Sequence, residues 1–282
     1  MHTNIKHIFI SLLLISSTIS FAQLTTNTGI NPQALVQNTL IGPGVTVSNI
    51  TFNGSPSSIG SFSGTGTNLG IANGIIITTG TVIDNGSGPH GPNNQAGAGQ
   101  TNGGAGSTLL SGIIGGGQTY DAAILEFDFI PITNKISFDY IFSSEQYLIN
   151  ASSNQCNYTD GFAFLLKPVD NSTPYQNLAI VPGTTIPVKI NTVRGNGSVC
   201  PPANQSYFDA FNGTNHPTNF NGQTVIMKTE ANVIPGRPYH IKLVIADQGN
   251  NLYDSAIFLG ANSFNVGANL GSDKLIATNN PN

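Results

Sequence analysis

Short apolar runs, separated by turns rich in Gly and Asn, recur along almost the whole chain, and this pattern restricts the fold most. Runs such as 136–142 and 239–245 alternate between apolar and polar residues, as strands with one buried face do. The run 74–80 is apolar and bounded by glycines, which indicates a fully buried strand. Because no helical pattern separates these runs, we predict an all-β protein with a single β-sandwich of the jelly-roll or lectin-like kind. The other predicted strands are 123–129, 162–166, 186–190, 225–227 and 256–259.

One short N-terminal helix and long Gly/Asn-rich loops complete the predicted fold. Asn31 and Pro32 are suited to the N-cap and the first position of a helix that continues over 33–37. The segment 84–106 contains 8 Gly in 23 residues, which predicts a long loop. A loop of this length either has a function or is mobile.

The first 22 residues resemble a secretory signal peptide. Lys6 provides a positive charge, 8–15 is apolar, and small residues precede a cleavage point at Gln23. The apolar stretch is shorter than the roughly 20 residues of a membrane-spanning helix. We therefore expect an extracellular protein, released or attached to the cell surface, with no transmembrane segment after signal removal. The expected organisation is a signal peptide over 1–22, one domain over 23–266 and a polar tail over 267–282 that is disordered or a truncated linker.

The low charge content excludes several functions. Charged residues make up 8% of the chain, with 9 Lys and Arg against 13 Asp and Glu. Nucleic acid is excluded as a partner, because neutralising phosphates requires clustered Lys and Arg. Glu126 and Asp128 would share one strand face, but the motifs of serine hydrolases, P-loop enzymes and zinc peptidases are missing. We therefore expect that the protein is not an enzyme.

Cys156 and Cys200 are the only cysteines. In an exported protein a disulfide between them is the simplest interpretation. It would close a loop of about 44 residues and contribute about 3–4 kcal/mol in the chain-entropy model. Two free thiols are the alternative.

Three groups of acidic and amide side chains lie at the ends of predicted strands, and we expect them to meet at one edge of the sandwich. Their oxygen atoms are the ligands that Ca²⁺ prefers, so calcium is the one cofactor we expect. The alternative is that these side chains only form Asx turns. The candidate metal ligands are Glu145, Asp160, Asp247, Asn250, Asn251 and Asp254.

Aromatic residues lie beside the acidic groups. We assign ligand binding to Tyr147, Tyr158 and Tyr253, because aromatic rings stack on sugars while Asn and Asp bond to hydroxyl groups. Packing is the alternative role for these rings. His240 and Lys242 are predicted to face outward from their strand, where His240 is solvated or structural rather than a general base.

Several segments also follow one another in a distinctive order. They are 35–38, 42–49, 59–62, 69–71, 74–80, 138–147, 160–164, 239–247, 253–259 and 263–264. Over roughly residues 33–266 this order resembles the choice-of-anchor L domain family. The resemblance implies a β-domain that bacteria secrete or display, often within large adhesin-like proteins, and it brings no catalytic residues. Asn250 stands where the family pattern often has Asp, which removes one charge from the candidate calcium site.

These observations predict a non-catalytic binding or adhesion module of a bacterial envelope protein, secreted or at the cell surface. We expect calcium to stabilise it and a surface ligand, a glycan or a protein, to be its partner. One alternative is a secreted hydrolase that acts on polysaccharide or protein. The other is a structural spacer within a larger adhesin.

Overall fold

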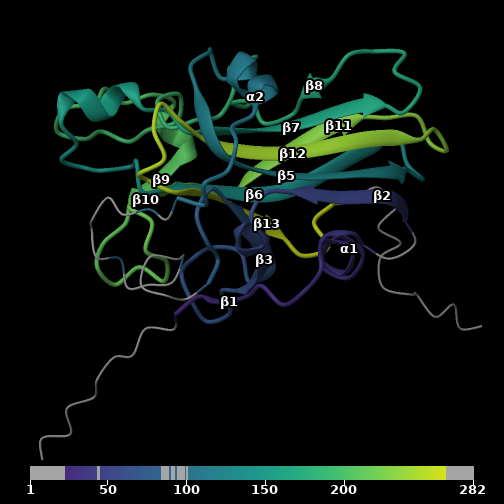
Figure 1. Cartoon of the computed structure of the whole chain (residues 1–282), viewed down its shortest axis with the longest axis horizontal. Coiled ribbons are helices and arrows are strands. Elements are labelled where there is room, and N and C mark those ends of the chain that lie inside the picture. Colours follow the sequence, from purple (N-terminus) through teal and green to yellow (C-terminus); the bar gives the residue numbers. More distant parts are fainter. Residues whose placement is uncertain are drawn as a thin grey trace, which may run out of the picture.

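A computed structural model describes residues 23–42, 45–83, 89, 93, 99 and 101–264. The expected signal peptide, the expected tail and most of the segment 84–100 lie outside these residues. The described chain forms two antiparallel sheets that pack face to face (Figure 1), which confirms the predicted all-β sandwich. In this part of the chain, no helix is long and apolar enough to span a membrane.

The larger sheet has eight strands. Seven of them follow the order β1-β3-β4-β13-β6-β10-β9, and β11 pairs with the remaining length of β6. Their bounds are β1 Thr25–Asn27, β3 Ile59–Ser63, β4 Asn73–Thr78, β6 Lys135–Ser144, β9 Phe208–Phe211, β10 Gly222–Thr224, β11 Met227–Asn232 and β13 Ser255–Gly260.

The smaller sheet has five strands in the order β2-β5-β12-β7-β8, so β12 lies at its centre. Glu126 and Asp128 face outward from β5 while Phe127 and Phe129 face the core, as the alternation predicts. The strand bounds are β2 Thr46–Asn53, β5 Thr119–Ile130, β7 Gly161–Pro168, β8 Gln176–Asn177 and β12 Tyr239–Gln248.

The main core lies between the sheets and is rich in aromatic rings. Phe138 of β6 contacts Phe164 of β7 edge to face, with ring centroids 4.8 Å apart. Phe264, after the last strand, packs against Phe127 and Phe129 of β5. A smaller apolar cluster covers the outer face of the larger sheet, so β4 and β13 are buried on both faces.

The helices are short. The expected N-terminal helix, α1, spans Pro32–Ala34 with Asn31 as its N-cap, and a π-helix over Leu35–Leu40 continues it. A second helix, α2 over Thr108–Ile113, escaped sequence prediction; the Ser107 hydroxyl caps it by accepting from the amide of Leu110. It packs on the outer face of the five-stranded sheet. Three 3-10 turns occupy Pro56–Ser58, Ser153–Asn157 and Gln205–Tyr207.

Two predicted strands were wrong in detail. The run 186–190 forms no strand, and it makes only two isolated bridges, from Pro187 to Ile180 and from Lys189 to Gly161. Pro187 has no N–H to donate to a ladder, which explains this result. In the run 225–227 only Met227 belongs to a strand, because Val225 and Ile226 lie in the break between β10 and β11, which both pair with β6.

Candidate functional site

The strand-end acidic residues meet at one end of the sandwich. Ser144 at the end of β6 is the register partner of Ser255 at the start of β13, which brings Glu145 and Asp254 together. The pairing of β12 with β7 does the same for Asp247 and Asp160. The Ser255 hydroxyl donates to Asp160 at 2.8 Å and so joins the two sheets. We call Glu145, Asp160, Asp247 and Asp254 the acid cluster.

All four carboxylates are buried, at 0–4% exposure. Burial raises the pKa of Glu145 to about 10, and the neighbouring Asp254 adds to this rise. Burial also raises the pKa of Asp160 to about 7, against the opposing effect of hydrogen bonds from Gln248 and Ser255. The pKa of Asp247 rises for the same reason and because of the nearby charges of Asp160 and Asp254. The cluster therefore favours bound protons or a bound cation.

Asp247 is the carboxylate that most clearly requires a bound proton or a bound cation. It is 1% exposed, yet within the described part of the chain neither of its carboxylate oxygens accepts a hydrogen bond of good geometry. The hydroxyl of Thr79 lies close enough to lower the pKa of Asp247 slightly. Among the described residues, no Lys, Arg or His forms an ion pair with Glu145, Asp160 or Asp247. Buried carboxylates are normally paired or hydrogen-bonded, so this one lacks its usual compensation.

Asp121, near the start of β5, is a further buried carboxylate at this end that the sequence analysis missed. Its positive φ of 48° is a conformation that Asp and Asn adopt more readily than most residues. The carboxylate accepts from the Gly104 amide at 2.6 Å and from the Thr101 hydroxyl at 3.0 Å. Asp121 therefore holds the segment 101–104 against this end of the sandwich. Asp121 lies two residues before the predicted strand 123–129, where no local pattern indicated this role.

The two amide candidates lie at the edge of the acid cluster. The Asn250 side chain accepts from the amide of Leu252 at 3.0 Å, so it forms the Asx turn of the alternative interpretation. Asn251 donates to the Thr101 hydroxyl at 2.7 Å. Within the described ranges, no group of three or more His, Cys, Asp or Glu is already arranged to hold a metal ion.

The three tyrosines occupy different environments. Tyr147 is fully buried, and its hydroxyl donates to the carbonyl of Val193 at 2.8 Å. Tyr158 is partly exposed and packs against the backbone of Gly249, and Tyr253 is partly exposed. Tyr147 therefore contributes packing first, although its ring also lines a cavity.

This cavity, which we call the Asn pocket, has a volume of about 340 Å³ and lies beside the acid cluster. The buried Oδ1 of Asn212 has no hydrogen-bond partner among the described residues, while its Nδ2 donates to the carbonyl of Phe220. The Asn221 amide donates to the Glu145 carboxylate at 2.8 Å, which connects the pocket to the acid cluster. The pocket is lined by Tyr147, Leu148, Ile149, Asn150, Phe211, Asn212, Gly213 and Asn221.

The predicted disulfide between Cys156 and Cys200 is confirmed, with 5.3 Å between the Cα atoms. It holds the loop that borders the Asn pocket. Ser198, two residues before Cys200, donates from its amide and its hydroxyl to the carbonyl of Ile149. The disulfide therefore stabilises one wall of the pocket.

Fold and site together define an antiparallel β-sandwich with buried carboxylates and an uncharged pocket at one end. The chain belongs to the choice-of-anchor L domain family, whose model matches residues 23–265. Membership suggests a secreted or surface-associated bacterial protein. The comparisons found no matching curated protein and no matching solved structure.

Proposed function

We propose that this chain is a non-catalytic binding module of the bacterial surface, in which calcium bound at the acid cluster shapes a pocket for a neutral carbohydrate. The observation that carries the proposal is the buried carboxylate of Asp247, which among the described residues accepts no hydrogen bond of good geometry and has no cationic partner. A divalent cation would compensate this charge together with that of Asp160.

The residues fit calcium by the chemistry of their donor atoms. Asp160 and Asp247 would hold the ion, with Thr79 and Asp254 beside them. Ca²⁺ accepts neutral oxygen atoms as well as carboxylates, so hydroxyl and backbone carbonyl groups would complete the set of ligands. The bound ion would supply positive charge and fix the ends of β7, β12 and β13 relative to one another.

The lining of the Asn pocket supports a neutral, polar ligand. Its aromatic residues, Tyr147 and Phe211, offer apolar contact, and three Asn side chains offer amide groups. None of the described residues that line the pocket is charged. Aromatic rings beside amide groups suit a sugar, which has apolar C–H faces and hydroxyl edges.

The same burial favours binding over hydrolysis. Glu145, Asp160 and Asp247 are at most 2% exposed. A carboxylate that acts on a glycosidic bond must reach the scissile oxygen or an attacking water molecule.

Thermal unfolding of residues 23–264 at pH 7.5, with millimolar Ca²⁺ or with a chelator, tests the metal. We expect calcium to raise the midpoint, because the ion binds the folded state. Asp160→Asn and Asp247→Asn should remove this rise, whereas Asp139→Asn, on β6 outside the cluster, should keep it. An identical midpoint with calcium and with chelator would refute the metal site.

Binding to an array of neutral oligosaccharides tests the pocket. Ile149 is 49% exposed and lines the pocket, so Ile149→Arg should block it without disturbing the core. The matched control is Ile132→Arg, at a similarly exposed position outside the pocket. Equal binding by both variants would place the ligand elsewhere, and absence of binding by the wild type would favour the spacer alternative.

A further inference from the structure

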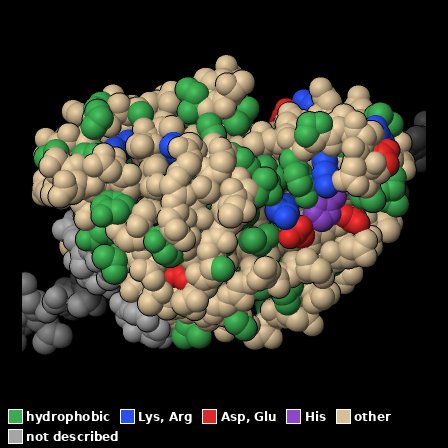
Figure 2. Space-filling view, turned by 45° about the horizontal axis from the view of Figure 1, so that its top comes forward, with side chains coloured by type: hydrophobic (Ala, Val, Ile, Leu, Met, Phe, Trp, Pro, Cys, Tyr) green, Lys and Arg blue, Asp and Glu red, His purple; other side chains and the backbone are tan. Residues whose placement is uncertain are grey.

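The outer face of the five-stranded sheet has two different halves. α2 covers one half, where Ala163, Leu165, Val244 and Ala246 pack beneath it. Charged side chains are concentrated on the other half. This is unusual in a chain with only 9 Lys and Arg and 13 Asp and Glu residues. Figure 2 shows charged and histidine side chains gathered in one recess of a surface that is otherwise mostly uncharged.

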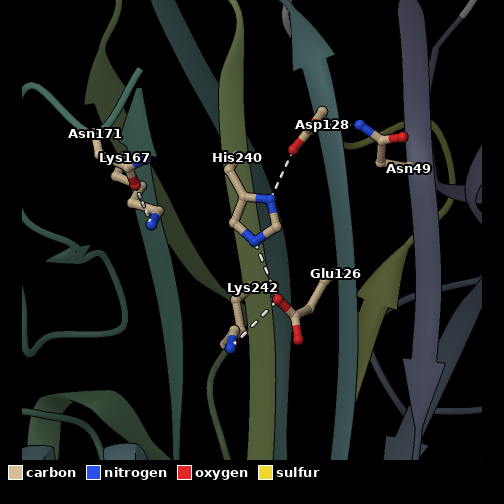
Figure 3. A network of polar contacts seen from close by, with 7 residues as sticks. All are labelled: Asn49, Glu126, Asp128, Lys167, Asn171, His240 and Lys242. Carbon is tan, nitrogen blue, oxygen red and sulfur yellow. Dashed lines mark hydrogen bonds and ion pairs between the residues drawn. The ribbon is translucent and has the colours of Figure 1, made fainter. Parts of the chain in front are cut away.

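The strand register assembles this charged group. Lys167 of β7, His240 of β12 and Asp128 of β5 are direct cross-strand partners and form one row. Lys242 and Glu126 form the next row on the same face. Figure 3 shows His240 between Asp128 and Glu126, with Lys242 beside Glu126 and Lys167 beside Asn171.

Both carboxylates are compensated within this group. Asp128 lies 2.6 Å from His240 Nδ1 and accepts from the Asn49 amide at 2.7 Å. Glu126 lies 3.1 Å from His240 Nε2 and 3.3 Å from Lys242 Nζ. Asn49 reaches Asp128 from a β-bulge in β2, where its φ is 53°.

Lys167 is the exception. Its ammonium donates to the neutral Oδ1 of Asn171 at 2.6 Å and lies 4.5 Å from the ring centre of Tyr175. Across the part of the chain that the structure describes, no carboxylate forms an ion pair with it. A hollow of about 190 Å³ opens beside Lys167, lined by Asp128, Lys167, Val169, Asn171, Tyr175 and His240.

We infer that this hollow binds a hexuronate residue of an acidic polysaccharide. Lys167 would pair with the sugar carboxylate, because Lys167 is the one charge of this group that no described residue compensates with an opposite charge. Asp128 and Asn171 would accept from the sugar hydroxyls, and Tyr175 would contact the ring. The small volume suits one sugar ring.

The charge pattern favours an acidic sugar over an acidic peptide. Among the described residues, Lys167 is the one cation of the hollow without a carboxylate partner, with Asp128 in the wall and Glu126 one row away. These carboxylates would repel the closely spaced charges of a peptide rich in Glu or Asp. A polysaccharide that carries one carboxylate per ring places a single charge in the hollow.

Isothermal titration calorimetry of residues 23–264 with trigalacturonate, in a chelator and at low salt, tests the inference. The chelator separates this site from the calcium proposal, whose failure would leave the result unchanged. We expect binding of trigalacturonate and none of its fully methyl-esterified form, which keeps the rings and loses the charge. Lys167→Gln should weaken binding by about tenfold or more, the effect of losing one charge-assisted contact.

Matched variants make the test specific. Lys228→Gln changes another exposed lysine, on β11 of the opposite sheet, and should leave the affinity unchanged. Tyr175→Ala should weaken binding, while Ile149→Arg in the Asn pocket should not. Equal binding of the esterified sugar, equal binding of hexaglutamate, or full affinity in Lys167→Gln would each overturn the inference, as would no binding of trigalacturonate.

Discussion

The acid cluster and the charged face of the five-stranded sheet both contain carboxylates, but they differ in whether these carboxylates have a partner that compensates their charge. On the sheet face, Glu126 and Asp128 each have a cationic or histidine partner on the neighbouring strand. At the strand ends, Asp160 and Asp247 are buried side by side without such a partner among the described residues. Cross-strand pairing therefore accounts for the first group, whereas the second depends on protons or on a cation from outside the chain.

The largest expected difference between the two regions is in pH dependence. The pKa of Asp160 rises to about 7 and that of Glu145 to about 10, so the folded state binds protons more tightly than the unfolded state. With a chelator, stability should be greatest near pH 4 and fall by several kcal/mol as the pH rises toward 8. One pKa unit corresponds to about 1.4 kcal/mol. Denaturant unfolding at a series of pH values measures this.

Calcium should weaken or reverse this fall in stability with pH, because the ion needs deprotonated carboxylates. In saturating calcium the free energy of unfolding should therefore fall less between pH 5 and 8, or rise. Parallel pH curves with and without calcium would contradict the distinction drawn here between the two regions.

Neutralising one acid in each region should give opposite signs. In a chelator at pH 8, Asp247→Asn should stabilise the fold by about 1–3 kcal/mol, because it removes a buried charge without a partner. Asp128→Asn should destabilise it by about 1 kcal/mol, because it removes a charge that His240 and Asn49 compensate. Denaturant midpoints of both variants decide this. Destabilisation by both would show that Asp247 has a partner at the strand ends after all.

Replacing His240 should have an intermediate effect on the free energy of unfolding. Its two ring nitrogens face Asp128 and Glu126, so His240→Gln should cost about 1 kcal/mol and leave two carboxylates on neighbouring positions of β5. The cost should shrink at high salt, which screens the interaction between partly exposed charges. A cost that does not change with salt would indicate lost packing rather than lost charge compensation.

The smallest effect is expected for the exposed ion pair of Lys135 and Glu230, in which both side chains are about half exposed. Lys135→Gln should change the free energy of unfolding by less than about 0.5 kcal/mol. This variant sets the baseline for an ion pair in water, against which His240→Gln is compared. A larger effect would mean that exposed pairs stabilise this low-charge fold more than expected.

Local patterns in the sequence predicted most of the fold. Alternation in 123–129 gave the correct faces of β5, and Asn31 with Pro32 located the N-terminal helix. The meeting of Glu145, Asp160 and Asp247 followed from strand ends, since the ends of antiparallel neighbours share an edge of a sheet.

The remaining features depend on contacts between distant segments. The Asn pocket joins residues near 147 with residues near 211 and 221, and no local pattern contains that pairing. The role of Asn49 required a bulge in β2, and that of Asp121 a positive φ. The helix α2 lies in Gly-rich sequence, where the capping hydroxyl of Ser107 was its only signal.

The position of β13 determines how the domain would respond to mechanical force. β13 lies inside the larger sheet, hydrogen-bonded to β4 on one side and to β6 on the other, and Phe264 just beyond it is packed into the core. β1, by contrast, is an edge strand of three residues. Force applied to the chain after Phe264 would act on the pairings of β13 with β4 and with β6 at once, and it would have to pull an aromatic ring out of the core. Force applied to the chain before Thr25 would have to separate only the short pairing of β1 with β3. The domain should therefore resist tension far better from its C-terminal side.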